Sequence, residues 1–481
     1  MKTRQEDTHA TTTAFLAAAA LLAILALAAP AAAASPPQLR VGTAAVQITP
    51  QVEPDGPEVW LAGYGRGRRA EGVHDDLWAR AVVFESAGKR IALVTLDLIG
   101  LFHQDVEAIR ARVRRVSPQI GVDGCIVVST HTHSGPDTMG FWGKHPFTSG
   151  VDPAYLELVR SRAASAVLSA SAALAPASLR IAATRAPGLS RDSRLPYVVD
   201  ERVHVLEADA VPGGRPIVTL VHWSAHPTSL ERRGGLVSAD YVGSLLEAVS
   251  DERDCPAIFL NGAIGGQVSA SEASVDGRPA APRTFGHAEE IGEDVADIAC
   301  DALEESTPIE SAPLVLTTTA VLVPLTNPIY RAGILLGVVG RPIFRGGEPA
   351  SRLGAALASA CIRTEIGVFQ IGPVRIGLVP GELYPELLDG IGLDKVEPGA
   401  DFPDAPPEPA LRPMLGGKYA FVICLANDEI GYILPRSRWD EKAPYCFGRD
   451  RPQYGERNSA GPFTAPTLFG AFQKLTGALG K

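Results

Sequence analysis

Continuous apolar runs, rather than strict alternation of apolar and polar residues, are the strongest pattern in the chain after residue 36. Such runs predict strands that are buried on both faces of a sheet. The strands expected on this basis are Ile91–Leu96, Cys125–Ser129, Ile217–Trp223, Ala257–Asn261, Leu314–Val323, Thr364–Gln370, Val374–Val379 and Tyr419–Leu425. Helices are expected at Gln104–Val116, Pro153–Ala172, Asp240–Ser250 and His287–Glu304. Strands separated by helices predict an α/β fold with mixed β-sheets and flanking helices.

The composition adds few restrictions to this fold. The 481 residues are 46% hydrophobic and 20% charged, which is typical of a globular protein with a large core. The formal net charge is -10, and no dense stripe of lysine and arginine occurs, so a nucleic-acid partner is not expected. The six cysteines are scattered without a C-x-x-C pair, which argues against a cysteine metal site and assigns no disulfide.

The N-terminus has the pattern of a targeting segment. Lys2 and Arg4 precede the apolar run Phe15–Ala29, and the small residues Ala31–Ala34 follow. This order is typical of a secretory signal peptide, which we expect to occupy residues 1–34. The chain is then secreted, periplasmic or at the cell surface. An uncleaved membrane anchor is the alternative, because the apolar stretch is almost long enough to span a bilayer.

Histidines follow two of the expected strands. His131 and His133 lie just beyond Cys125–Ser129, and residues two apart in extended chain face the same side. Either both imidazoles bind a metal, or one binds it while the other contacts substrate. His226 lies just beyond Ile217–Trp223 and is a better ligand candidate than a histidine inside that strand.

Two oxygen-bearing residues follow other strands. Glu382 comes after Val374–Val379, where it either binds a metal or complements the positive end of a helix. Tyr432 comes after Tyr419–Leu425, where a tyrosine is commonly part of the core. Because ligands in α/β sheets gather outside the strand ends, we expect these side chains to meet. Two imidazoles, a carboxylate and a phenol would form a zinc site with room for a water.

A series of motifs resembles a known family. They are Gly63-Tyr64, Gly72-Val73-His74, Trp78-Ala79-Arg80-Ala81, Thr95-Leu96-Asp97-Leu98, the T-H-T-H-S-G-P run at residues 130–136, and Ser238-Ala239-Asp240. In this order they resemble the N-terminal catalytic domain of the neutral, non-lysosomal ceramidases, over roughly residues 40–475. The resemblance implies the fold of that domain and four Zn²⁺ ligands: His131, His226, Glu382 and Tyr432.

The resemblance also implies the remaining site residues. Ser269 corresponds to a family serine that is described as nucleophile or as substrate anchor. Its surroundings differ from the family pattern, since Gln267 stands where the family tends to have Asp. Arg191 corresponds loosely to an arginine near the amide, and His133 would contact the substrate or the zinc water.

The implied function is hydrolysis of an N-acyl amide, that of ceramide or a related lipid, to a fatty acid and an amine. Residues 37–481 would form one zinc hydrolase domain without the C-terminal β-sandwich domain of the full ceramidases. Two alternatives stay open. One is a zinc hydrolase that acts on a non-lipid amide or ester, and the other is a zinc-stabilised binding module at the cell surface.

The segment Ile329–Phe344 is apolar, rich in glycine and interrupted by Arg331 and Arg341. One interpretation is a buried connection between elements. The other is an apolar flap that borders the site and receives the acyl chain, with the two arginines meeting anionic headgroups. The second interpretation would bring the protein into peripheral contact with a membrane.

Overall fold

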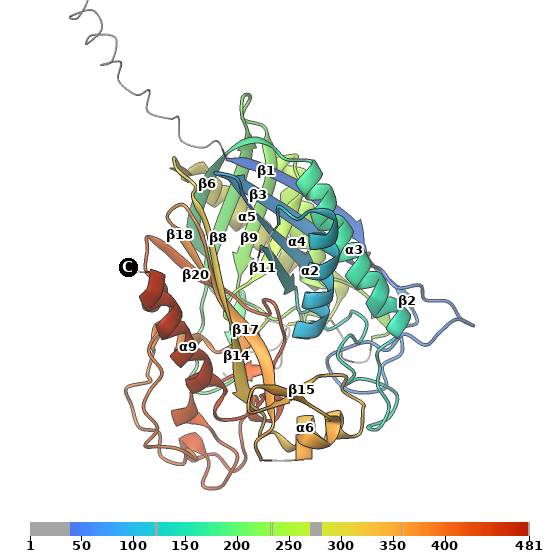
Figure 1. Cartoon of the computed structure of the whole chain (residues 1–481), viewed down its shortest axis with the longest axis vertical. Helices are drawn as coiled ribbons and strands as arrows, with labels where there is room; N and C mark the ends of the chain where they lie inside the picture. The colour runs from blue at the N-terminus through green and yellow to red at the C-terminus, as the bar shows by residue number, and fades with distance from the viewer. Residues whose placement is uncertain are drawn as a thin grey trace, which may run out of the picture. The chain divides into compact units, whose positions relative to one another are not determined.

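Two β-sheets form the centre of the fold in this computed structural model (Figure 1). The structure describes residues 39–120, 124–230, 232, 234–269, 281–356 and 358–479, and residues 39–481 form one compact unit. The predicted signal peptide lies outside the described residues. Within the described residues, no helix is both long and apolar enough to cross a membrane.

The larger sheet has nine strands and mixed directions. Its strands, in spatial order, are β11 (Ala257–Asn261), β9 (Pro216–Trp223), β8 (Arg202–Ala210), β6 (Ala175–Arg185), β1 (Arg40–Gln47), β3 (Trp78–Ser86), β4 (Lys89–Leu96) and β5 (Cys125–Ser129), with β13 (Thr307–Ile309) paired to β6. The outermost pairs at both edges are parallel. The carboxyl ends of β9 and β11 therefore lie together, as do those of β4 and β5.

The smaller sheet has six strands: β16 (Glu348–Ala350), β15 (Ile343–Arg345), β17 (Cys361–Ile371), β18 (Val374–Leu378) and β20 (Tyr419–Ile423), with β14 (Leu314–Pro324) paired to β17. Three short pairs are formed by β2 (Gly72–Val73) with β10 (Leu236–Val237), β7 (Ser190–Asp192) with β12 (Gln267–Ser269), and β19 (Glu382–Leu383) with β21 (Tyr432–Ile433). The pair β18 and β20 is parallel, so these two strands also end at the same edge.

The sheets face each other across one apolar core, and helices cover their outer faces. Phe84 of the larger sheet meets Phe369 of the smaller one in this core. The larger sheet is covered by α2 (His103–Val116), α3 (Pro153–Ala172), α4 (Tyr241–Arg253) and α5 (Phe285–Glu304). The smaller sheet is covered by α8 (Leu411–Leu415) and α9 (Thr464–Leu479), and α7 (Pro385–Asp389) packs against α8. The predicted α/β class with flanking helices is confirmed.

Several strands have no counterpart among the expected elements. The strands β1, β3, β6 and β8 lie in the middle of the larger sheet but interrupt their apolar residues with polar ones. A search for continuous apolar runs does not find such strands. The segment Ile329–Phe344 is more than a plain connection, since it holds most of α6 (Pro328–Leu335) and the start of β15.

The two sheets are joined where their strands end. Val128 of β5 forms a bridge with Ala426, beyond β20, and the Asn427 amide donates to the Val127 carbonyl at 2.7 Å. The Asn261 side chain at the end of β11 donates to the Ser129 carbonyl at 2.8 Å. The carboxyl ends of β5, β11 and β20 are thus held at one edge of the fold.

A buried ion pair strengthens this junction. Arg110 of α2 binds Glu365 of β17 through both Nη atoms, and its Nε donates to the Cys125 carbonyl at 2.8 Å. The Asn427 side chain donates to the same carboxylate at 2.9 Å. Burial alone would lower the pKa of Arg110, but the bond to Glu365 raises it. The pair therefore links one helix and both sheets.

Replacing Glu365 by Gln is expected to lower the free energy of unfolding by about 3 kcal/mol, because Arg110 would lose its buried carboxylate and keep only the partly exposed Glu107 as a counter-charge. Chemical denaturation measures the loss. Arg215→Gln is the control, since Arg215 and its partner Asp254 have side chains that are 74% and 86% exposed. It should cost about 0–1 kcal/mol. Equal effects of the two variants would show that the buried pair does not join the layers.

Candidate metal centre

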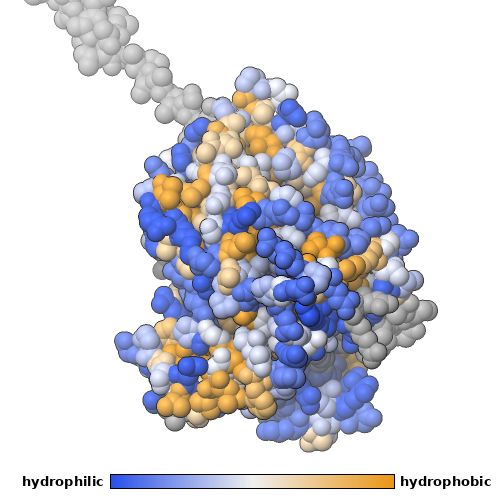
Figure 2. All heavy atoms as spheres, turned by 90° about the vertical axis from the view of Figure 1, so that its right-hand side faces the viewer, coloured by the Kyte–Doolittle hydropathy of each residue, from blue (hydrophilic) through white to orange (hydrophobic). Residues whose placement is uncertain are grey.

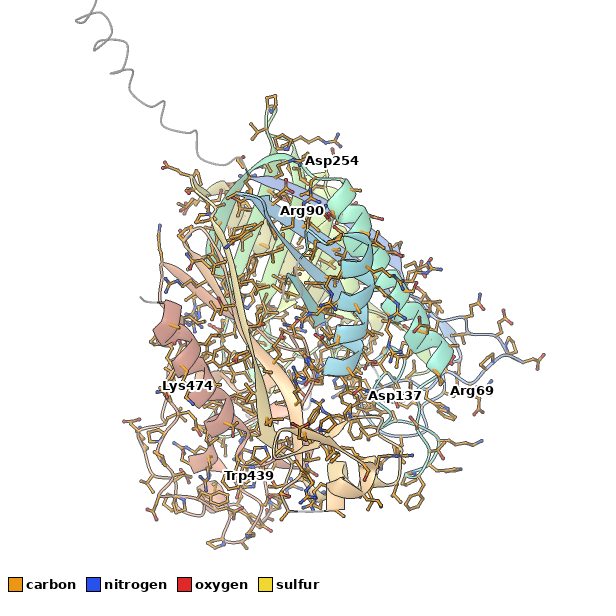
Figure 3. All side chains as sticks on the ribbon, in the orientation of Figure 1. Arg69, Arg90, Asp137, Asp254, Trp439 and Lys474 are labelled. Atoms are coloured by element: carbon orange, nitrogen blue, oxygen red, sulfur yellow. The ribbon has the colours of Figure 1, made fainter. Side chains whose placement is uncertain are left out.

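The four side chains predicted as ligands come together beyond the strand ends. His131 and His226 lie on the loops after β5 and β9, while Glu382 and Tyr432 open β19 and β21. These two short strands are parallel, and Glu382 is directly opposite Tyr432. All four side chains are buried. Trp439, which packs in the cluster around Tyr432, lies at the lower end of the molecule in Figure 3, opposite Asp254.

One carboxylate oxygen is at the centre of the group. Glu382 Oε2 lies 2.7 Å from His226 Nε2 and 3.5 Å from His131 Nε2. The Tyr432 hydroxyl lies 3.3 Å from the same His226 nitrogen. Two nitrogens and two oxygens therefore surround one small volume.

Backbone carbonyls determine which imidazole nitrogens carry hydrogen. His131 Nδ1 lies 2.6 Å from the Ile99 carbonyl, and His226 Nδ1 lies 2.6 Å from the Gln267 carbonyl. A carbonyl can only accept, so each Nδ1 donates, and each Nε2 of a neutral ring presents a lone pair. Those lone pairs face the Glu382 carboxylate, which also has only lone pairs. A cation shared by these atoms satisfies all of them, and this donor set suits a metal ion such as zinc.

Burial and the neighbouring imidazoles have opposite effects on the pKa of Glu382. Burial would raise the pKa of this carboxyl, but His131 and His226 outweigh burial and hold the pKa low. Burial, followed by the charge of Glu382, raises the pKa of the Tyr432 phenol above its ordinary value. The side chains thus provide one carboxylate and one protonated phenol next to the two imidazoles.

A third imidazole borders the group. The ring centre of His133 is 4.9 Å from that of His131 and 5.8 Å from that of His226. Neither ring nitrogen of His133 has a hydrogen-bond partner among the described residues. Burial, and then the two neighbouring imidazoles, lower the pKa of His133 well below its ordinary value. An uncharged imidazole therefore remains available to a ligand.

The local backbone differs from the extended chain that the sequence predicted here. His131 has a φ of 71°, in the left-handed region, and the strand ends before it. The His131 amide donates to the Leu98 carbonyl at 2.8 Å, and the Thr132 hydroxyl donates to the Ser238 carbonyl at 2.7 Å. His131 and His133 do lie together, but a fixed turn brings them together and not a two-residue repeat.

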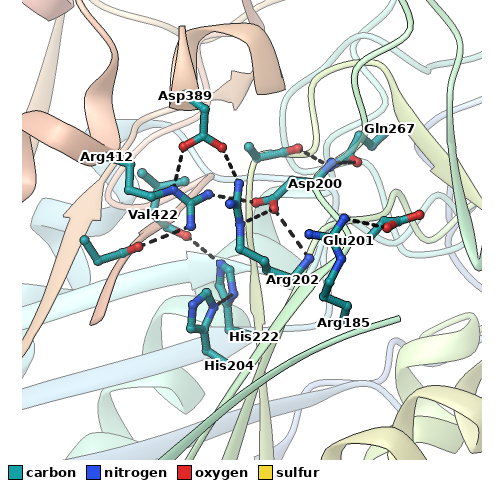
Figure 4. A network of polar contacts seen from close by, with 12 residues as sticks. Arg185, Asp200, Glu201, Arg202, His204, His222, Gln267, Asp389, Arg412 and Val422 are labelled. Atoms are coloured by element: carbon teal, nitrogen blue, oxygen red, sulfur yellow. Dashed lines mark hydrogen bonds and ion pairs between the residues drawn. The ribbon is translucent and has the colours of Figure 1, made fainter. Parts of the chain in front are cut away.

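Gln267 holds His226 in place. Its carbonyl accepts from both Nδ1 and the backbone amide of His226, at 2.6 and 3.0 Å. Its buried side chain donates to the Ala263 carbonyl and accepts from the Asp200 amide at 2.7 Å. Asp200 in turn pairs with Arg202 and Arg412, and both arginines also bind Asp389 (Figure 4). No sequence pattern indicates this role, because the contact to the histidine comes from the backbone of Gln267.

The pairing of β7 with β12 gives the positions of the other two predicted residues, Arg191 and Ser269. Arg191 is opposite Val268 in the pair of β7 and β12, and Val268 forms a bridge with His226. Arg191 is thus one strand away from His226. Ser269 is opposite Ser190 in the same pair. The side chain of Ser269 lies outside the described part of the structure.

The segment Ile329–Phe344 reaches the neighbourhood of the site. Ile334, Val339 and Arg341 line a narrow, mostly apolar cavity together with Glu429 and Ile430. The cavity measures about 10 Å³, the space of about one water molecule. Arg341 is buried and ion-paired with Asp428. It therefore cannot meet lipid headgroups, and that part of the expectation was wrong.

A larger cavity lies elsewhere. It measures about 470 Å³ and is bordered by Thr43 of β1, by α4 and by Phe285 of α5. None of the four clustered side chains lines it. Size alone would select this cavity, and its walls include His74 and carboxylates such as Asp240, but the converging imidazoles of His131, His133 and His226 lie elsewhere. We therefore assign the candidate site by its chemistry.

Comparisons with known proteins agree with the resemblance in the sequence. Residues 39–256 match the family model described as neutral/alkaline non-lysosomal ceramidase, N-terminal. The fold matches the crystal structure of neutral ceramidase from Pseudomonas aeruginosa with a TM-score of 0.67, at 18% identity, over 92% of this chain and 74% of that one.

A structure of a ceramidase complexed with C2 matches with a TM-score of 0.67, at 17% identity, over 92% of this chain and 75% of that one. No curated protein matches. The resemblance to the neutral ceramidases and the shared fold are confirmed.

Gly63→Ala is expected to displace His133. A Cβ at Gly63 would lie 2.5 Å from the His133 ring, and its φ of 77° disfavours alanine. The control is Gly67→Ala, because Gly67 has a φ of 76° but only the Lys144 carbonyl near its Cβ, at 3.6 Å. Gly63→Ala should cost about 1–3 kcal/mol more than the control and shift the imidazole NMR signals of His133. Identical stability and signals in the two variants would contradict the packing described here.

Stability is expected to fall as pH rises, because of Glu386. This buried carboxyl has no partner on either oxygen among the described residues, and burial raises its pKa from 4.5 to about 7. The folded protein then binds more protons than the unfolded chain between those values, so unfolding becomes easier with increasing pH. Glu386→Gln should remove this loss, which is about 3 kcal/mol above pH 7. Unfolding curves at several pH values test it, with exposed Glu290→Gln as control.

Proposed function

We propose that this chain is an exported, zinc-dependent amidohydrolase of the neutral ceramidase type. Its substrate would be the N-acyl amide of ceramide or a related lipid, and its products a fatty acid and an amine. One observation carries the proposal: the Nε2 atoms of His131 and His226 both face the Glu382 carboxylate. The match of residues 39–256 to the ceramidase model supports the reaction class.

The proposed zinc ligands are His131, His226, Glu382 and Tyr432. The imidazoles are oriented for this role because the carbonyls of Ile99 and Gln267 hold their Nδ1 hydrogens. When bound, zinc supplies a Lewis acid for an acyl carbonyl and lowers the pKa of a water. The protein supplies the geometry around it, through bonds to the backbone that do not depend on the substrate.

Three further residues are proposed to act on the substrate. Neither ring nitrogen of His133 has a hydrogen-bond partner in the part of the chain that the structure describes, so His133 can hydrogen-bond the amide or move a proton. Arg191 is one strand from His226, and we propose that it contacts the substrate near its amide. Ser269 follows Val268 in the strand that bridges to His226, and it acts as nucleophile or as anchor.

Export and domain organisation complete the proposal. Residues 1–34 would form the signal peptide, and residues 37–481 would form one hydrolase domain. The lipid substrate and the exported location together suggest peripheral contact with a membrane. Zn²⁺ would be the single cofactor of this domain.

A zinc hydrolase for a non-lipid amide or ester is the second candidate. The narrow cavity under α6 favours it, because an acyl chain does not fit into a cavity of about 10 Å³ unless the segment Ile329–Phe344 moves.

A zinc-stabilised binding module is the third candidate. His133 lies beside the four ligands without a hydrogen-bond partner among the described side chains and backbone, which favours a site that receives a substrate over such a closed structural site.

Zinc content and substrate range test the proposal together. The full chain should hold one zinc, hydrolyse ceramide faster than simple esters or N-acyl amino acids, and lose activity with a chelator. His131→Ala should lower zinc affinity by at least about 100-fold while the exposed His145→Ala does not. Full zinc content in His131→Ala would contradict the ligand set. Turnover of esters only would favour the second candidate.

Ser269→Ala separates the two roles of the serine. If Ser269 only anchors the substrate, we expect KM to rise and kcat to fall by about 10-fold or less, as for loss of one hydrogen bond. If it is the nucleophile, kcat should fall by about 10⁴-fold or more. Zinc content must stay at the wild-type level in both cases. Unchanged kcat and KM would remove Ser269 from the site.

A further inference from the structure

Large aliphatic side chains are exposed side by side on α6 and on the adjacent 3₁₀ helix η1 (Arg352–Ala356). Ile329 is 48% exposed, Leu336 is 58% exposed and Leu353 is 73% exposed. Leu335 adds a further exposed side chain, at 37%. The two segments are in contact, since Arg331 Nε donates to the Ala355 carbonyl. Figure 2 shows apolar residues gathered at the lower left, at the height that α6 and β15 occupy in Figure 1. We call Ile329, Leu335, Leu336 and Leu353 the α6 face.

The surroundings of the α6 face are basic. Arg331, Arg345 and Arg352 belong to the same region, with Glu348 as an exposed carboxylate among them. The loop around Phe141 packs on α6, with 5.0 Å between the rings of Phe141 and Tyr330, and it carries the exposed Lys144. None of these four basic side chains forms an ion pair with another described residue. This local excess of positive charge occurs on a chain with a net charge of -10.

The α6 face is close to the candidate metal centre. Its buried neighbour Ile334 lines the narrow cavity that Glu429 and Ile430 also line. The next residue along the chain, Gly431, accepts a hydrogen bond from the Glu382 amide at 3.1 Å. A molecule that enters beneath α6 would therefore arrive next to a proposed zinc ligand.

We infer that the α6 face docks on an anionic lipid bilayer, which brings the bilayer surface close to the candidate metal centre. This inference rests on the proposed lipid substrate, and it adds the surface by which the protein meets that substrate. Aliphatic side chains enter the interfacial region of a bilayer, and arginines beside them attract anionic headgroups. A second copy of the chain is a weaker occupant, because a stable dimer buries about 1,200 Å² or more, far above what four partly exposed side chains supply.

Binding of the full chain to vesicles tests the docking without any catalytic step. Flotation with phosphatidylcholine vesicles, with and without phosphatidylglycerol, gives the partition coefficient. Leu336→Ser/Leu353→Ser should lower it by about 10-fold or more. Arg345→Glu/Arg352→Glu should remove the preference for phosphatidylglycerol. Each arginine is expected to contribute roughly a factor of five to the partition coefficient. Val116→Ser/Val396→Ser is the matched control, because these side chains are 64% and 68% exposed elsewhere on the surface, and it should bind as the wild type does.

Several results would overturn the inference. The inference is wrong if the wild-type protein does not bind vesicles. It is also wrong if the Leu336→Ser/Leu353→Ser variant binds vesicles as well as the wild type does. Light scattering shows whether the wild-type protein is a dimer. If it is a dimer that does not bind vesicles, and if the double variant is a monomer, the α6 face binds a second copy of the chain. Hydrolysis of a water-soluble short-chain amide is measured separately and should be equal in wild type and double variant. Failure of that hydrolysis in the wild type would reject the proposed function, while vesicle binding would still decide the docking.

Discussion

The contact between Glu382 and His226 is the constraint on which the rest of the site depends. Two acceptor atoms, a carboxylate oxygen and an imidazole Nε2, lie 2.7 Å apart in a buried volume. Without a positive charge between them this arrangement repels, and burial of an unpaired carboxylate is strongly unfavourable. Because the Gln267 carbonyl holds the other nitrogen of the ring, the imidazole cannot rotate to relieve the contact without losing that bond. The site is therefore arranged for a bound cation.

The fold maintains this contact by joining two sheets at their ends. Parallel pairs at the edges of both sheets bring the loops after β5, β9, β18 and β20 to one place. The bridge between Val128 and Ala426 then connects the sheets at that place. The apolar cores between the sheets and beneath the helices supply the burial, while hydrogen bonds of the loops to backbone carbonyls set the directions of the side chains. A change in the core thus affects the site only through these loops.

The sequence predicted the parts of the fold that have a strong local signal. Continuous apolar strands such as β5 and β9 were found, whereas β6 and β8, which alternate with polar residues, were not. The T-H-T-H run identified His131 locally, but Glu382 and Tyr432 have ordinary local explanations. Only their common position after strands, together with the resemblance to the ceramidases, selected them. Gln267 and Glu386 could not be predicted, because their roles depend on which distant backbone groups and charges the fold places beside them.

Zinc-edge anomalous diffraction from crystals grown with zinc tests whether these four side chains hold one metal ion. We expect one strong peak within about 2.0–2.2 Å of His131 Nε2, His226 Nε2, a Glu382 oxygen and the Tyr432 oxygen. His133 would remain outside the coordination sphere. Absence of a peak at this place, with Glu382 bonded directly to a protonated His226, would show that the side chains bind each other and not a metal ion.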